Sequence, residues 1–330
     1  MAISRRRLVG LAAAMPLSPA LGQGLEQVTF GTNWVAQAEH GGFYQALADG
    51  TYRRHGLDVT LVPGGPQVNN RLKLAAGKLD FYMGGNMIQA FAAVEQNVPT
   101  VVVAALFQRD PQVLIAHPGT GIETFADLKR LPTIFVSQAG AATYWQWLKA
   151  EHGFRDAQLK PYTFNPQPFL ADRQSAMQGY VTSEPHAIER AGGFRPKVFL
   201  LAEVGFDPYA TTIEIRRSML AERPDTARRF VEASIIGWQS FMSGDNRPAI
   251  TLIKRDNPDM DDDKLGYATT ALHDHGIVQT EETLSLGIGC MTDTRVKRFF
   301  DLMVRTGLAR PALDWRQAFD ARFVNRGYVR

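Results

Sequence analysis

The chain has 330 residues, of which 45% are hydrophobic and 21% are charged, a composition typical of globular proteins. Its formal net charge is +3, and three adjacent arginines near the start account for that excess. The balanced remainder argues against binding to nucleic acid or to an anionic membrane, and a single cysteine, Cys290, excludes both an intrachain disulfide and a cysteine-rich metal site.

The first 22 residues predict an export signal. A serine and three arginines at positions 4–7 precede a short apolar run, and small residues follow it at positions 20–22. This pattern is typical of a secretory leader, and its consecutive arginines indicate the twin-arginine route. The run is shorter than the roughly 20 residues that span a bilayer. We therefore expect a periplasmic protein that begins at Gln23; the alternative is an ordinary apolar N-terminal helix.

Downstream of the leader, short apolar strands alternate with helices. Strands are expected at residues 28–30, 57–62, 80–83, 100–107, 113–116, 133–136, 162–164, 180–182, 197–202 and 210–215. Helices are expected at residues 41–54, 68–76, 84–96, 124–129, 141–151 and 169–178, and helical pattern dominates from Pro224 onward. This alternation predicts an α/β protein with mainly parallel sheets flanked by helices.

The alternation starts anew after Asp110-Pro111, which predicts two lobes rather than one. We expect lobe 1 to comprise residues 23–108 and 208–330, and lobe 2 to comprise residues 109–207, with the chain crossing between them twice. An architecture of this kind places a ligand cleft between the lobes.

Three predicted turns between a strand and a helix are rich in small residues: Gly64-Gly65, Gly84-Gly85-Asn86, and the segment 137–141. Free N–H groups at a helix start, together with its partial positive charge, bind groups that accept hydrogen bonds. Glycine lets a ligand approach the backbone closely. The same small residues also serve backbone geometry alone, and none of these turns has dinucleotide-binding or phosphate-loop spacing.

Several ordered blocks resemble one family of binding proteins. Residues 33–44, followed by Gly56-Leu57-Asp58-Val59, are similar to the opening block of periplasmic substrate-binding proteins of the sulfonate, taurine, nitrate and thiamine-pyrimidine ABC importers. Residues 76–81, 121–129 and 180–185 resemble later blocks, so that the resemblance covers residues 28–241. It implies a two-lobed periplasmic binding protein of type II, a monomer without cofactor, which delivers a small ligand to the permease of an ABC importer.

Carried over residue by residue, the resemblance and the small-residue turns give a candidate ligand site. The block at 180–185 supplies a carboxylate in the thiamine-pyrimidine binders, and Glu184 is therefore expected to accept paired N–H bonds from the ligand. The alternatives are a solvated loop position for Glu184, helix capping for His40, and core or hinge packing for the aromatic residues. The predicted ligand-binding residues are Trp34, Gln37, His40, Gly65, Asn69, Asn86, Gln108, Ser137, Gln138, Gly140, Tyr144, Tyr180, Glu184 and Tyr209.

The residue types at these positions favour one class of ligand. A small hard anion is usually held by arginine or by several backbone donors. The predicted turns instead offer amides, aromatic rings and one acid, with Arg109 and Arg173 as the exceptions. We therefore predict a flat nitrogen heterocycle, similar to a pyrimidine, and the alternative is an alkanesulfonate or nitrate.

The rival to a binding protein is an enzyme. The resemblance extends to fungal relatives that synthesise the thiamine pyrimidine with an active-site histidine and an iron-binding cysteine run, whereas this chain has only Cys290. His273-Asp274-His275 is a poor metal motif, because adjacent positions on a helix point apart and no third ligand is evident. We therefore predict no catalytic residue and no metal; an extracytoplasmic sensor or chaperone-like module is a further alternative.

Overall fold

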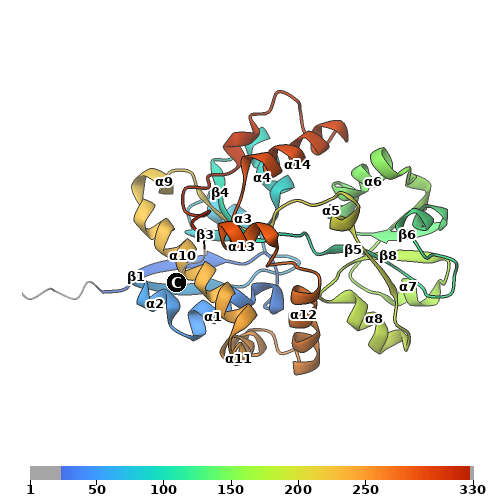
Figure 1. Ribbon diagram of the computed structural model, residues 1–330, viewed down its shortest axis with the longest axis horizontal. Coiled ribbons are helices and arrows are strands. Elements are labelled where there is room, and N and C mark those ends of the chain that lie inside the picture. The colour runs from blue at the N-terminus through green and yellow to red at the C-terminus, as the bar shows by residue number, and fades with distance from the viewer. Residues whose placement is uncertain (1–23, 328–330) are drawn as a thin grey trace, which may run out of the picture.

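The computed structural model describes residues 24–327, so the predicted export signal lies outside the described residues. It contains two five-stranded sheets, with strand orders β2-β1-β3-β10-β4 and β7-β6-β8-β5-β9. Helices flank each sheet, and the two units lie side by side as lobe 1 and lobe 2 (Figure 1). The predicted two-lobed α/β fold is confirmed.

The sheet of lobe 1 has four strands that run in one direction and one that runs against them. β10 (Ala210–Arg216) is antiparallel to both of its neighbours, β3 and β4. The helices of this lobe are α1 (Gly41–Ala48), α2 (Thr51–Arg54), α3 (Asn70–Ala75), α4 (Met87–Glu95), α9 (Met219–Glu222) and α10 (Pro224–Ser243). The remaining strands are β1 (Glu26–Gly31), β2 (Leu57–Val62), β3 (Phe81–Asn86) and β4 (Thr100–Phe107).

Lobe 2 repeats this plan, with β5 (Gln112–Ala116) as the single reversed strand between β8 and β9. Its other strands are β6 (Thr133–Val136), β7 (Leu159–Pro161), β8 (Ser175–Tyr180) and β9 (Lys197–Leu200). Its helices are α5 (Gln138–Ala141), α6 (Tyr144–His152), α7 (Gln167–Ala171) and α8 (Glu184–Gly192), and a 3-10 helix spans Phe125–Arg130.

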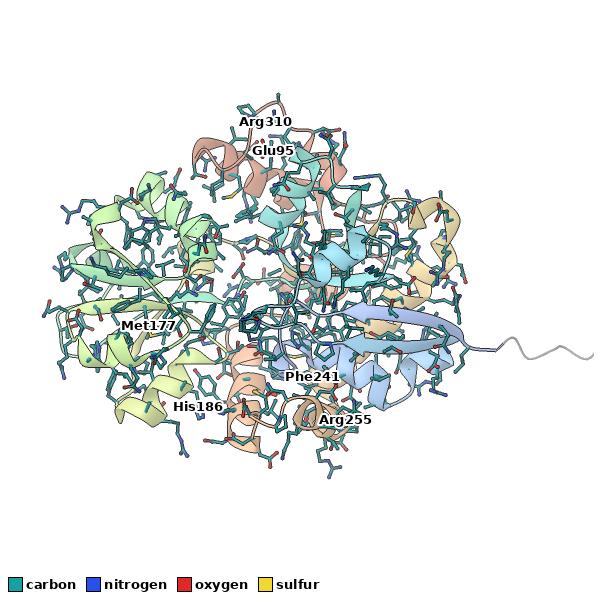
Figure 2. All side chains as sticks on the ribbon, turned by 180° about the vertical axis from the view of Figure 1, so that it is seen from behind. Glu95, Met177, His186, Phe241, Arg255 and Arg310 are labelled. Carbon is teal, nitrogen blue, oxygen red and sulfur yellow. The ribbon has the colours of Figure 1, made fainter. Side chains whose placement is uncertain are left out.

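The chain crosses from lobe 1 to lobe 2 between β4 and β5, and it returns between β9 and β10. We propose residues 23–108, 109–207 and 208–330 as the limits of these segments. The C-terminal helices α11 (Arg247–Asp256), α12 (Asp262–Asp274), α13 (Glu281–Leu286) and α14 (Asp293–Arg305) follow. Of these, α12 also touches lobe 2, because His186 Nε2 lies 3.3 Å from Asp263 Oδ2 (Figure 2).

The core of lobe 1 is built around the long helix α10. The ring of Phe230 stacks on Phe81 at 3.9 Å and on Tyr52 at 5.3 Å between centroids, and it meets Phe30 edge-on at 5.2 Å. Buried aromatic pairs of this kind add to the free energy gained from burying apolar surface. They fix α10 against the sheet of lobe 1.

Several predicted boundaries are wrong. The expected helix 41–54 is broken into α1 and α2, because Gly50 adopts a left-handed conformation with φ of 77°. The residues Gly84-Gly85-Asn86 end β3 instead of beginning a helix. The expected helix 169–178 stops at Ala171, and residues 175–180 form the central strand β8 in place of the expected strand 180–182.

The reason for the error at β8 is tertiary. Residues 175–179 are buried between β6 and β5, and pairing on both sides decides their conformation more strongly than their local periodicity does. The strand expected at residues 162–164 is likewise displaced, because β7 ends at Pro161. Across residues 24–327, no helix combines the length and the apolar character needed to cross a membrane.

Candidate ligand site at the interlobe junction

The carboxyl ends of the parallel strands of both lobes meet at one place. In lobe 1 the loop after β1 carries Trp34 and Glu39, and in lobe 2 the segments after β7 and β8 carry Phe164 and Thr182. The rings of Trp34 and Phe164 lie 5.5 Å apart, and the hydroxyl of Thr182 donates a hydrogen bond to Glu39. Ligands of open α/β sheets bind outside these strand ends. We call this region the interlobe junction.

Aromatic side chains line the junction from both sides. Phe164 is 58% exposed, which is unusual for a phenylalanine, and its φ of 61° places a non-glycine residue in the left-handed region. Its ring lies 5.5 Å from Tyr162 as well as from Trp34. Strained backbone of this kind persists only where the surroundings enforce it, and it gathers at functional sites. The arrangement leaves open aromatic surface on which a flat ring can stack.

Two buried carboxylates at the junction, Glu39 and Asp110, form no ion pair within the described part of the chain. Glu39 is only 3% exposed, and burial raises its pKa although the bond from Thr182 opposes the shift. Asp110 is also buried, and burial raises its pKa to about 6. Its carboxylate accepts bonds from Asn86 Nδ2 at 2.9 Å and from the N–H of Gln112 at 3.0 Å. The groups that donate to Glu39 and Asp110 are therefore neutral: a hydroxyl, a side-chain amide and a backbone N–H.

Glu184 is the first residue of α8, and its carboxylate turns back toward the preceding loop. Its Oε2 accepts the N–H of Tyr180 at 2.7 Å and the hydroxyl of Ser183 at 2.6 Å. Burial raises its pKa, and these two bonds only partly offset that effect. A Cβ on Gly179 would lie 2.6 Å from the Cβ of Glu184, so glycine is needed there. Oε1 takes part in neither of these two bonds.

The predicted residues of the turn after β6 form one connected network with Tyr144. Gln178 Oε1 accepts the hydroxyl of Tyr144 at 2.8 Å and the N–H of Ser137 at 2.7 Å. Gly140 leaves room for this tyrosine, because a Cβ there would lie 2.5 Å from its hydroxyl oxygen. Ser137 caps α5 by accepting the N–H of Gly140 at 3.2 Å. These contacts position the turn beside the junction.

Tyr180 also lies at the junction, and Gln37 and His40 belong to the segment after β1 that carries Trp34 and Glu39. Burial raises the pKa of Tyr180, and the carboxylates of Asp110, Glu39 and Glu184 raise it further, which places all three acids near this one phenol. Gln37 is half-buried. The side chain of His40 caps no helix, and burial lowers its pKa to about 3. Its two ring nitrogens have no partner among the residues described.

Five predicted residues make other contacts. Gln108 donates to the carbonyls of Ala105 at 2.9 Å and Cys290 at 3.2 Å, inside lobe 1. Tyr209 donates to Glu282 at 3.1 Å, also away from the junction. Asn69 is exposed and caps α3, and Gln138 is exposed at the start of α5. At Gly65, an added Cβ would lie 3.7 Å from Cγ1 of Val35.

Gln108 also lines a groove of about 890 Å³ at the hinge, between the two crossing segments and the C-terminal helices. Arg295 dominates its electrostatics, because it pairs with Asp207 and with Glu282, each at 2.9 Å. It also donates to the carbonyl of Gln108 and lies 4.2 Å above the ring of Tyr209. Arg295 thus ties both crossings to α14, which is a structural role.

The sequence analysis missed five residues of the junction, namely Glu39, Asp110, Tyr162, Phe164 and Thr182. Asp110 stands directly before Pro111 at the predicted crossing, and Thr182 belongs to the block at residues 180–185. Both residues could therefore have been predicted from the sequence. Phe164 could not be predicted in this way, because the sequence pattern predicts a strand at residues 162–164 and gives no sign that the side chain is exposed.

Comparisons with known proteins agree with this architecture. The family model described as "NMT1/THI5 like" matches residues 37–246, which is more than half of the chain. The chain belongs to this family. A riboflavin-binding protein, RibY, of Chloroflexus aurantiacus is 25% identical over 314 residues, which cover 92% of this chain and 87% of that protein.

Two further comparisons give the range of the family and fold. The 4-amino-5-hydroxymethyl-2-methylpyrimidine phosphate synthase of Schizosaccharomyces pombe is 30% identical over 115 residues, 34% of this chain and 33% of that enzyme. The crystal structure of the periplasmic aliphatic sulphonate binding protein SsuA from Escherichia coli matches with a TM-score of 0.62 and 15% identity, over 89% of this chain and 91% of that one. The latter likeness confirms the periplasmic-binding-protein fold.

Proposed function

We propose that this protein is an extracytoplasmic solute-binding receptor of an ABC importer, which captures a flat nitrogen heterocycle, similar to a pyrimidine, between its two lobes. The observation that supports this proposal most directly is the contact between Trp34 and Phe164, one from each lobe, whose tilted rings lie 5.5 Å apart between centroids. A ring that stacks on both side chains contacts both lobes at once. The loaded receptor, a monomer exported to the periplasm, then delivers the ligand to the membrane permease.

Capture occurs by closure of the lobes. A ligand that contacts both lobes stabilises the closed form in proportion to its preference for that form. The bond from Thr182 to Glu39 already joins the lobes, so the ligand enters when they separate and is enclosed when this bond forms again. Both side chains are buried, which strengthens the bond relative to one exposed to water.

The charges at the junction support a heterocycle over a sulfonate or nitrate. Within residues 24–327, no arginine or lysine forms an ion pair with Glu39, Asp110 or Glu184. A hard anion needs such a partner or a set of backbone donors. Riboflavin, the ligand that the name of RibY gives, is itself a flat nitrogen heterocycle.

An enzymatic role has less support. The likeness to the pyrimidine phosphate synthase covers only 34% of the chain. Cys290 is buried, donates to Gln108 Oε1 at 3.4 Å, and has a pKa raised by burial to about 12, so it is a poor nucleophile. Among the described residues, no three His, Cys, Asp or Glu side chains are grouped to hold a metal ion.

The proposal is tested with residues 23–330 in isothermal titration calorimetry against riboflavin, 4-amino-5-hydroxymethyl-2-methylpyrimidine, hexanesulfonate and nitrate. We expect saturable binding of a heterocycle, loss of that binding in Trp34→Ala, and recovery of the ligand unaltered. Leu72→Ala, which shortens an exposed leucine of α3, serves as the control. Binding of hexanesulfonate alone would refute the ligand class, and chemical conversion of the ligand would indicate an enzyme.

A further inference from the structure

The carboxylates of the junction form no ion pair with an arginine or lysine among residues 24–327. Glu39 comes from lobe 1, Asp110 from the first crossing and Glu184 from lobe 2, so the acids surround the junction from three segments of the chain. Their recorded hydrogen bonds come from hydroxyl, amide and backbone N–H groups only. Nothing in the described part of the chain brings an arginine or lysine within ion-pair distance of them.

Such an arrangement is unfavourable without a ligand. Buried carboxylates that lack a cation lose solvation, and like charges that lie close together repel each other. The three acids lie in one small region: Glu184 accepts the N–H of Tyr180, Asp110 accepts the N–H of Gln112, which pairs with Tyr180 in the sheet, and Glu39 accepts the hydroxyl of Thr182, two residues further on. A cation bound there would relieve both costs.

The aromatic side chains favour the same kind of ligand. Trp34, Tyr162 and Phe164 form a contiguous set, with centroids of successive rings 5.5 Å apart, and Phe164 and Tyr180 keep exposed surface. The face of an aromatic ring carries negative electrostatic potential and attracts a cation within about 6 Å of its centre. Aromatic faces and carboxylates therefore both favour a positively charged ligand.

We infer that the ligand of the interlobe junction is a positively charged heteroaromatic compound, stacked on Trp34 and Phe164 and neutralised by Glu39, Asp110 and Glu184. This inference rests on the proposed function, and it adds the sign of the ligand's charge. The positive charge distinguishes this site from one for a sulfonate and from one for a neutral ring such as riboflavin.

Two pairs of probes test the inference, because the members of each pair share a ring and differ in charge. The pairs are 1-methylnicotinamide with nicotinamide, and thiamine with 3-deazathiamine, in which a neutral thiophene replaces the thiazolium ring. Calorimetry on residues 23–330 at pH 8 should show that at least one cation binds about tenfold more tightly than its neutral counterpart. Glu39→Gln, Asp110→Asn and Glu184→Gln should each reduce that preference.

Glu189→Gln is the matched control, because it removes one exposed carboxylate from the same helix as Glu184. A second measurement needs no variant: at pH 6, where Asp110 is about half protonated, a bound cation displaces protons from carboxyls of raised pKa, so its apparent binding enthalpy should differ between phosphate and histidine buffers. This readout keeps the inference testable even if an acid variant fails to fold.

Different results would overturn the inference about charge and the proposed function. Binding of neither cation, or equal affinity for the charged and neutral members of both pairs, overturns the inference. If riboflavin or the neutral pyrimidine then still binds and depends on Trp34, the proposed function stands without the charge. If no heterocycle binds at all, the proposed function falls as well.

Discussion

The hydroxyl of Thr182 in lobe 2 donates a hydrogen bond to the carboxylate of Glu39 in lobe 1, although the two residues are 143 positions apart in the chain. Both side chains are buried, with 1% and 3% exposed. A buried bond to a carboxylate stabilises strongly when it is made and leaves a costly unsatisfied group when it is lost. This contact therefore favours the closed arrangement of the lobes.

Replacing Thr182 by valine keeps the shape of the side chain and removes the donor. We expect the free energy of unfolding to fall by about 1–3 kcal/mol and the radius of gyration to rise in small-angle scattering, because Glu39 loses its bond across the lobes. Thr269→Val is the control, since the Thr269 hydroxyl only bonds to Leu265 O in its own helix. Unchanged stability and size in Thr182→Val would contradict a closing role for this bond.

Phe164→Ala separates binding from folding. The side chain is 58% exposed, so its truncation should leave thermal stability nearly unchanged. Ligand affinity should fall about tenfold, because one of the two stacking faces is lost. Calorimetry with the tightest heterocycle found for the wild type measures this effect. An affinity equal to that of the wild type would place the ligand elsewhere.

The ionisation of Asp110 should be visible in the stability of the unliganded protein. Its pKa is raised from 3.8 to about 6 in the folded state, so between these values the folded protein binds more protons than the unfolded chain. Its contribution to stability is thus full below pH 4 and is lost as the pH rises through 6, by roughly 3 kcal/mol in all.

Asp110→Asn removes that ionisation. The difference in unfolding free energy between wild type and variant, measured by urea denaturation from pH 4 to pH 7, should shift in favour of the variant as the pH rises. A difference that stays constant over this range would show that Asp110 has an ordinary pKa.

Arg295 should matter for stability rather than for ligand charge. Its guanidinium pairs with Asp207 and Glu282 and is mostly buried, so Arg295→Gln leaves both carboxylates uncompensated and should cost about 3 kcal/mol. Arg298→Gln, on the same helix, is the control, because Arg298 forms no ion pair in the part of the chain that is described. Equal unfolding midpoints in the two variants would exclude the structural role of Arg295.

The fold could be predicted largely because strands and helices alternate with distinct local patterns, as β2 and β4 show. The position of β8 could not, because residues 175–179 form a strand only through pairing with β5 and β6. The site shows the same division. Ordered sequence blocks predict Trp34, Tyr180 and Glu184 as candidates for ligand contact, whereas the bond of Glu39 to Thr182 depends on how two distant segments meet.

Gln108 and Tyr209 make contacts that their place in the sequence did not predict. Both stand near the predicted crossings, which suggested a role in ligand binding. In the structure Gln108 bonds to Ala105 and Cys290, and Tyr209 bonds to Glu282 on the side of the hinge groove. A position in the sequence near a crossing does not say which side of the crossing a side chain faces.

The most direct test of the central claim is equilibrium dialysis of residues 23–330 against a defined mixture of heterocycles, alkanesulfonates, nitrate and amino acids, with mass spectrometry of the retained compounds. The account predicts that a flat nitrogen heterocycle is retained unaltered by the wild type and released by Trp34→Ala. Retention of a sulfonate by both proteins, or appearance of a new compound, would contradict a heterocycle receptor.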